Sequence, residues 1–167
     1  MVAAGLLDED DPCELIEGEL IEMPPIGNEH AGASNWLASR LGRIYQDVGF
    51  VSAGNPIVVG ENSRPQPDLA VIPGSPRDFL HRSPRGDELI LCVEIAQSSL
   101  RRDHGRASLY ARGGVPLYWI VDLDGRQIEV HEMPSAAGYR RVTYLGPEDE
   151  IAVPGTGESW RVAELLP

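Results

Sequence analysis

Two short apolar runs, each carrying one acidic residue, constrain this chain most. The first run extends from Gln66 to Ile72 and contains Asp68, and the second extends from Leu89 to Ala96 and contains Glu94. Their length and apolar content predict two buried β-strands. By the period of two, one face of the second strand carries Leu89, Leu91, Val93 and Ile95, and the other carries Ile90, Cys92, Glu94 and Ala96.

A carboxylate buried on a strand needs a compensating positive charge. A divalent cation shared by Asp68 and Glu94 through oxygen ligands would supply it. An arginine paired with the acids would supply it equally well, and structural ion pairs of this kind are at least as frequent as metal sites. The residues alone leave both alternatives open.

Size and composition favour one domain over residues 13–167, after a flexible acidic start over residues 1–12. The chain has 167 residues, of which 42% are hydrophobic, and its 18 glycines and 14 prolines indicate many turns. No apolar run is long enough for a membrane span, and no signal peptide is evident. Cys13 and Cys92 are too few for a disulfide framework or a zinc site, so we expect a cytoplasmic protein.

The charge of the chain limits how it could hold nucleic acid. A net charge of −12 argues against DNA binding by a broad positively charged surface. A nucleic-acid role would therefore need a local basic groove or a metal. All 14 basic residues are arginines. The absence of lysine excludes mechanisms that use an amine base or a Schiff base.

The order of the expected elements is strands, helix, strands, helix, strands, which predicts an α/β or α+β sheet with helices packed against it. A hairpin is expected from Glu14 to Met23, with its turn at Glu17-Gly18. The first helix is expected over residues 29–48 with Asn28 as its cap, and the second over residues 100–112 with Ser98 or Ser99 as its cap. Further strands are expected at 50–59, 116–122, 127–131 and 139–144, with a short strand or helical turn at 158–166, and a long loop at 75–87.

Three groups of side chains receive a structural interpretation. The charges of the second helix, among them Arg101, Arg102, Asp103, Arg106 and Arg112, are expected to form a mainly solvated face. Trp36, Trp119 and Trp160 are expected in the core. His30, His81, His104 and His131 are too scattered in the sequence to predict a metal cluster.

An ordered set of motifs resembles the Uma-type restriction endonuclease family, within the PD-(D/E)xK nuclease superfamily. The set comprises Glu14-Leu15-Ile16-Glu17-Gly18-Glu19-Leu20, the segment from Pro25 to His30, Gln66-Pro67-Asp68-Leu69-Ala70-Val71, Val93-Glu94-Ile95-Ala96-Gln97-Ser98-Ser99-Leu100, Tyr110-Ala111-Arg112-Gly113-Gly114-Val115-Pro116, Tyr118-Trp119-Ile120-Val121-Asp122, and Ile128-Glu129-Val130 with Gly138-Tyr139-Arg140. The resemblance extends over nearly the whole chain, from about Glu14 to Leu166.

The resemblance implies a restriction-endonuclease-like fold, a mixed central sheet flanked by helices with extra antiparallel strands. It implies a Mg²⁺ or Mn²⁺ site formed by Asp68, Glu94 and the Ile95 carbonyl. It also suggests that His30 lies at this site as a further metal ligand, and that Glu19 and Asp103 lie near the same pocket. The expected partner is DNA, with no membrane, and a homodimer is an open expectation because a duplex has two strands to cut.

The sequence departs from the superfamily pattern at the catalytic lysine. The position two residues after Glu94 is Ala96, and the position on the following helix that matches the displaced lysine is Arg106. Arginine binds phosphate or a carboxylate but does not act as a base. Gln97 is a second candidate for orienting a water.

Two hypotheses follow from this departure. The first is a metal-dependent endonuclease that hydrolyses DNA phosphodiester bonds, with Asp68, Glu94, Arg106 and Gln97 as the catalytic set. The second is a catalytically degenerate protein of the same fold that serves as a binding or interaction module. Its expected signature is Arg106 bridging Asp68 and Glu94.

Overall fold

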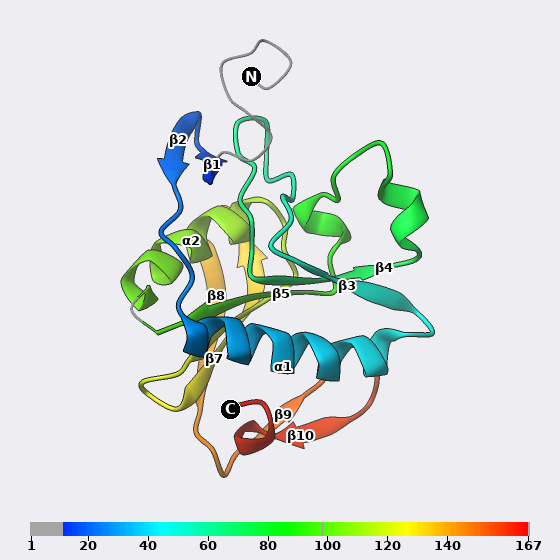
Figure 1. Ribbon diagram of the computed structural model, residues 1–167, viewed down its shortest axis with the longest axis vertical. Helices are drawn as coiled ribbons and strands as arrows, with labels where there is room; N and C mark the ends of the chain where they lie inside the picture. The colour runs from blue at the N-terminus through cyan, green and yellow to red at the C-terminus, as the bar shows by residue number, and fades with distance from the viewer. Residues whose placement is uncertain (1–11, 98, 167) are drawn as a thin grey trace.

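A six-stranded mixed sheet forms the centre of the protein, as a computed structural model shows (Figure 1). The structure describes residues 12–97 and 99–166, so the expected flexible start lies outside the described residues except for Pro12, as does Ser98. The elements are β1 Cys13–Ile16, β2 Glu19–Glu22, α1 Asn28–Tyr45, β3 Gly49–Ala53, β4 Leu69–Pro73, β5 Leu91–Ala96, α2 Leu100–Arg112, β6 Leu117–Asp122, β7 Gln127–Ser135, β8 Gly138–Leu145, β9 Glu150–Ala152 and β10 Ser159–Arg161.

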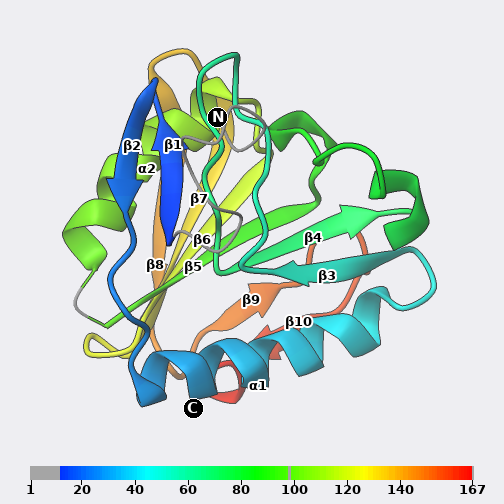
Figure 2. The ribbon, with the colours of Figure 1, turned by 45° about the horizontal axis from the view of Figure 1, so that its top comes forward.

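The strand order of the sheet is β3-β4-β5-β6-β7-β8. β5 and β6 pair in parallel because α2 connects them by a crossover, and the other neighbours pair antiparallel. β1 and β2 form the expected hairpin, which is a separate two-stranded sheet that stands beside α2 (Figure 2). β9 and β10 form a second small sheet near α1.

The two faces of the sheet support two apolar cores, as the alternation in β5 predicts. Leu91, Val93 and Ile95 lie in the core that α1 and the C-terminal residues cover. Cys92 and Ala96 lie in the core that α2 covers. Glu94 points to this second face, which places a carboxylate among apolar side chains beneath α2.

Helix α1 is shorter than expected at its C-terminus. Gly27 is its N-cap, Asn28 is its first residue, and it ends at Tyr45 because Gly49 begins β3 rather than ending the helix. A Cβ at position 49 would lie 2.3 Å from the Ile72 carbonyl oxygen, so the close β3–β4 approach requires glycine. In consequence Val48 is exposed rather than part of the buried stripe.

The strand expected at 50–59 is also shorter in the structure. β3 ends at Ala53, where Gly54 has a φ of +61° and Pro56 has no N–H to donate. The residues beyond it fold back, and Ile57 and Val59 pack into the core under α2.

Among the tryptophans, only Trp119 is fully buried, Trp160 is half-buried, and Trp36 is 46% exposed. Trp160 still packs against the core beneath α1, whereas the core prediction is wrong for Trp36. Both rings lie against the Arg40 guanidinium, with 5.6 Å from it to the centre of Trp36 and 4.8 Å to that of Trp160. In the stretch from Val115 to Val121, Val115 and residues 118–121 are buried in the core, whereas Pro116 is exposed.

Replacing each of two glycines in the α2 region by alanine is expected to have opposite effects on stability. A Cβ at Gly105 meets no atom within 4 Å, whereas a Cβ at Gly113 would lie 2.5 Å from Val59 Cγ1. We expect Gly105→Ala to raise the free energy of unfolding by about 0.5–1 kcal/mol, since alanine favours helix. We expect Gly113→Ala to lower it by about 1–3 kcal/mol through overpacking. Urea unfolding of both variants measures the difference, and equal effects would contradict the packing of α2 on Val59.

Candidate active site

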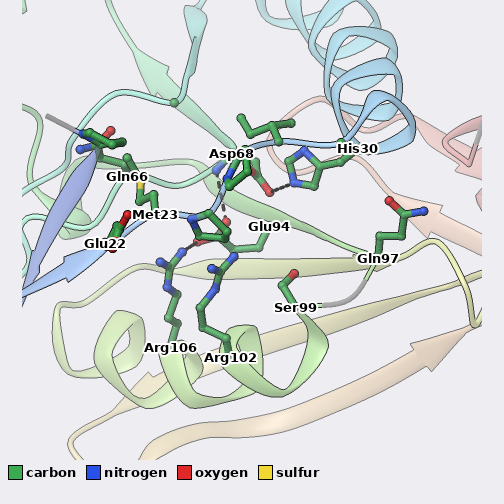
Figure 3. A pocket seen from close by; sticks show the side chains of 16 residues that line it. Glu22, Met23, His30, Gln66, Asp68, Glu94, Gln97, Ser99, Arg102 and Arg106 are labelled. Atoms are coloured by element: carbon green, nitrogen blue, oxygen red, sulfur yellow. Dashed lines mark hydrogen bonds and ion pairs between the residues drawn. The ribbon is translucent and has the colours of Figure 1, made fainter. Parts of the chain in front are cut away.

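A pocket of about 720 Å³ lies where the start of α1, the end of the hairpin, β5 and α2 meet (Figure 3). Its polar lining includes Gln66, Asp68, Glu94, Arg102 and Arg106, and the mainly apolar segment from Met23 to Gly27 lines it as well. Asp68 and Glu94 therefore open into one cavity.

The register of β4 and β5 explains why the two acids meet. Leu69 pairs with Val93 in the antiparallel ladder, and the next step in this register places Asp68 opposite Glu94. The Asp68 N–H donates to Glu94 Oε2 at 3.3 Å. The sheet itself thus fixes the separation of the two carboxylates.

The Asp68 carboxylate is held from two sides. Its Oδ2 accepts the Ile95 N–H at 2.7 Å and lies 3.0 Å from His30 Nε2, which comes from the first turn of α1. The hydrogen bond to Asp68 raises the pKa of His30 above its ordinary value, against the opposing effect of burial. His30 is therefore placed to donate to Asp68 and to fix its orientation (Figure 3).

Glu94 is 3% exposed, and its Oε1 accepts two hydrogen bonds from side chains of α2. Its Oε1 accepts from Arg106 Nη1 at 2.8 Å and from the Tyr110 hydroxyl at 2.7 Å. Burial, together with the nearby charges of Asp68 and Asp103, raises the pKa of Glu94 well above its ordinary value. Burial thus makes a charged Glu94 costly unless positive groups lie beside it.

Arg106 joins Glu94 to Glu14 rather than to Asp68. Its Nη2 contacts Glu14 Oε1, and Glu14 is itself buried, with its other oxygen 3.3 Å from the Gln66 N–H. The expected bridge between Asp68 and Glu94 is thus replaced, because β1 brings a third acid to the opposite side of the guanidinium. The expectation of a solvated face on α2 is wrong for Arg106 and Asp103, which are both buried.

The other sequence-predicted residues lie at the margin of the pocket or outside it. Gln97 lines the rim, but its amide contacts Glu29 instead of facing the acids (Figure 3). Asp103 is buried beside the pocket, where it accepts the Ser99 hydroxyl at 2.5 Å, and burial raises the pKa of Asp103. Glu19 is exposed on β2 and is not among the described residues that line the pocket.

Sequence reasoning missed Glu14 and Tyr110. A signal for Glu14 was present, because the period of two places it on the same face of its strand as Ile16, which packs against the core under α2. Tyr110 lies four residues after Arg106, so both side chains point from one face of α2 toward Glu94.

A second cluster of titratable groups lies between α2 and β7. Glu129 is 1% exposed, and its oxygens lie 2.9 Å from His104 Nε2 and 3.2 Å from His131 Nε2. The fold thus brings together two histidines that are distant in sequence. No group of three or more His, Cys, Asp or Glu side chains among the described residues is arranged to hold a metal ion, and this holds for this cluster.

The burial of His131 predicts a stability that depends on pH. Burial lowers the pKa of His131 below its ordinary value of 6.5, despite the opposing hydrogen bond to Glu129. The unfolded chain therefore binds this proton more readily, and stability present above pH 6.5 is lost as the pH falls. The raised pKa values of His30, Glu94 and Asp103 act in the opposite direction, so the prediction concerns the difference between two proteins. From about pH 7 to pH 5, the slope of melting temperature against pH should be more positive for wild-type protein than for His131→Gln. An unchanged slope in the variant would exclude His131 as its source.

One family model matches almost the whole length of the chain. The family described as "Putative restriction endonuclease", Uma2, matches residues 5–164. The chain belongs to the Uma2 family. None of the curated proteins compared with it matches this Uma2 chain.

A solved structure shares the fold of this Uma2 protein. It is a "putative nuclease belonging to DUF820" from Anabaena variabilis, with a TM-score of 0.80 and 15% sequence identity, over 98% of this chain and 94% of that chain. The likeness confirms the predicted restriction-endonuclease-like fold, with its mixed central sheet, flanking helices and extra antiparallel strands. None of the described helices is long and apolar enough to span a membrane.

The donor chemistry of the Uma2 pocket fits a hard divalent cation such as Mg²⁺. Asp68 and Glu94 offer adjacent carboxylates in one pocket, and Mg²⁺ typically binds one or two carboxylates and keeps several waters. The lack of a three-residue cluster among the described residues is compatible with that ligand number. It is a poor match for Zn²⁺, which takes three or four protein ligands.

Proposed function

We propose that this protein is an endonuclease that uses Mg²⁺ or Mn²⁺ to hydrolyse DNA phosphodiester bonds. The observation that carries the proposal is the position of Asp68 directly opposite Glu94 in a pocket open to solvent. Membership of a family described as a restriction endonuclease supports DNA as the substrate.

Asp68 and Glu94 would hold the cation, with the Ile95 carbonyl as a third oxygen. When bound, the cation supplies an activated water and neutralises charge that develops on the phosphate. His30 donates to Asp68 Oδ2, so its role is to orient that ligand rather than to bind the metal itself.

The positive groups of the pocket would contact the phosphate. Arg102 lines the pocket and its side chain is 44% exposed, so it can reach a phosphate oxygen. Arg106 is buried between two carboxylates, which makes it a charge-balancing residue near the reaction. Gln97 faces Glu29, so we assign no water-orienting role to it. A homodimer, which would present two such pockets to a duplex, stays a prediction.

A catalytically silent binding module is the second candidate. The pairing of Arg106 with Glu94 favours it, because an arginine that neutralises the acid reduces the need for a metal. The lack of lysine favours it as well, since the chain offers no amine base.

A metal-binding and cleavage experiment separates the two candidates. Protein freed of metal by chelation is titrated with Mn²⁺ in a calorimeter and incubated with supercoiled plasmid in Mg²⁺ or Mn²⁺. The proposed nuclease binds Mn²⁺ and nicks the plasmid, and Glu94→Gln loses both properties. Wild-type protein that neither binds Mn²⁺ nor nicks DNA would support the binding module.

A further inference from the structure

The guanidinium of Arg106 is shared between two buried carboxylates from different parts of the chain. One is Glu94 on β5, at 2.8 Å, and the other is Glu14 on β1, in contact with Nη2. The exposed fractions of the three side chains are between 2% and 8%. Water therefore screens these charges little, and each one strongly affects the others.

The sharing determines how much of the Arg106 charge acts on Glu94. Arg106 and a divalent cation are alternative counter-ions for the Glu94 carboxylate, since each neutralises the same charge. With Glu14 in place, the three residues sum to one negative charge beside Asp68. Without the charge of Glu14 they would sum to zero, and Arg106 would act on Glu94 alone.

We propose that Glu14 is a positioning residue of the metal site. It holds one side of the Arg106 guanidinium, which keeps Glu94 from being fully neutralised and so sets the affinity of the Asp68–Glu94 pair for a divalent cation. This inference rests on the proposed metal-dependent function. It makes the β1–β2 hairpin, which is outside the central sheet, part of the site.

The hairpin supplies a matched control for this role. Glu17, at the hairpin turn, pairs with Arg112 of α2, so the same two elements are joined by a second ion pair. The Glu17 and Arg112 side chains are 65% and 43% exposed, and neither is among the described residues that line the pocket. Glu17→Gln therefore weakens the attachment of the hairpin without changing the charge around Glu94.

The experiment measures Mn²⁺ affinity by calorimetry for wild-type protein, Glu14→Gln, Glu14→Asp, Glu17→Gln and the double variant Glu14→Gln/Arg106→Gln. Glutamine at position 14 keeps the size and an acceptor oxygen but removes the charge. We expect it to weaken Mn²⁺ binding by on the order of tenfold. Glu14→Asp and Glu17→Gln should bind within about threefold of wild type, because neither changes the charge of the site.

The double variant tests the mechanism. It removes one negative and one positive charge, so Mn²⁺ affinity should return close to the wild-type value, while the Tyr110 hydroxyl still donates to Glu94. Melting temperatures show that each variant is folded at the temperature of the titration.

Two results would overturn the inference while leaving the proposed function intact. One is an Mn²⁺ affinity of Glu14→Gln equal to that of wild-type protein, which would leave Glu14 with only a structural role. The other is a double variant as weak as Glu14→Gln. Absence of Mn²⁺ binding in wild-type protein would instead contradict the proposed function, and this inference with it.

Discussion

Replacing Asp68 by asparagine is expected to abolish Mn²⁺ binding and to lower the rate of DNA nicking by more than about a hundredfold. Asparagine keeps the size of the side chain, so it can still accept from Ile95 N–H, which Asp68 Oδ2 does at 2.7 Å. The expected loss of Mn²⁺ binding therefore results from the removal of a negative charge at the proposed metal site. Calorimetry with Mn²⁺ and a plasmid-nicking time course measure it.

An exposed acid serves as the control for Asp68. Asp87 pairs with Arg85 at 3.2 Å, and its side chain is 56% exposed. Asp87→Asn makes the same change of net charge away from the pocket, so nicking should stay at the wild-type rate. Equal nicking by Asp68→Asn and wild-type protein would remove Asp68 from the catalytic set.

Replacing Trp119 by alanine is expected to lower the free energy of unfolding by about 3–5 kcal/mol. Trp119 lies on β6, is fully buried, and packs in the core beneath α1. For a chain of this size, the loss corresponds to a melting temperature lower by roughly 6–20 °C. Differential scanning calorimetry measures it.

The matched variant Trp119→Phe should be milder, at about 1–2 kcal/mol. The Trp119 Nε1 atom is buried without a hydrogen-bond partner, so phenylalanine removes ring volume but no hydrogen bond. If both variants were equally destabilised, the indole would have a role beyond filling the core.

The fold and the acidic pair could be predicted because they depend on local patterns. The period of two gave the correct face to each residue of β5, from Leu91 to Ala96, since alternation is a property of any strand. It was wrong for Leu89 and Ile90, which precede β5: Leu89 packs in the core under α2, and Ile90 packs against the core under α1. The same rule placed Glu94 on the face of Cys92 and Ala96, whereas the covering of that face by α2 is known only from the structure. The short runs around Asp68 and Glu94 also predicted neighbouring strands.

The counter-ion arrangement could not be predicted, because it depends on how separate elements dock. The period of two in β1 indicates that Glu14 faces the core, as Ile16 does. Glu14 reaches Arg106 only when the β1–β2 hairpin lies against α2, and no local pattern specifies that docking. The expected site instead included Glu19, on the other strand of the hairpin. The assignment of Gln97 to the catalytic set was limited in the same way, since its contact with Glu29 comes from the packing of α1.

The sequence separations within the site have a consequence for how the protein folds. Asp68 and Glu94 are 26 residues apart and meet through the β4–β5 ladder, whereas Glu14 and Arg106 are 92 residues apart. Closing the longer loop loses more chain entropy, so on this ground the acidic strands pair before the hairpin docks. Two carboxylates would then face each other in a partly folded chain. A cation bound between them, whether a proton, a metal ion or the guanidinium of Arg106, would reduce their mutual repulsion.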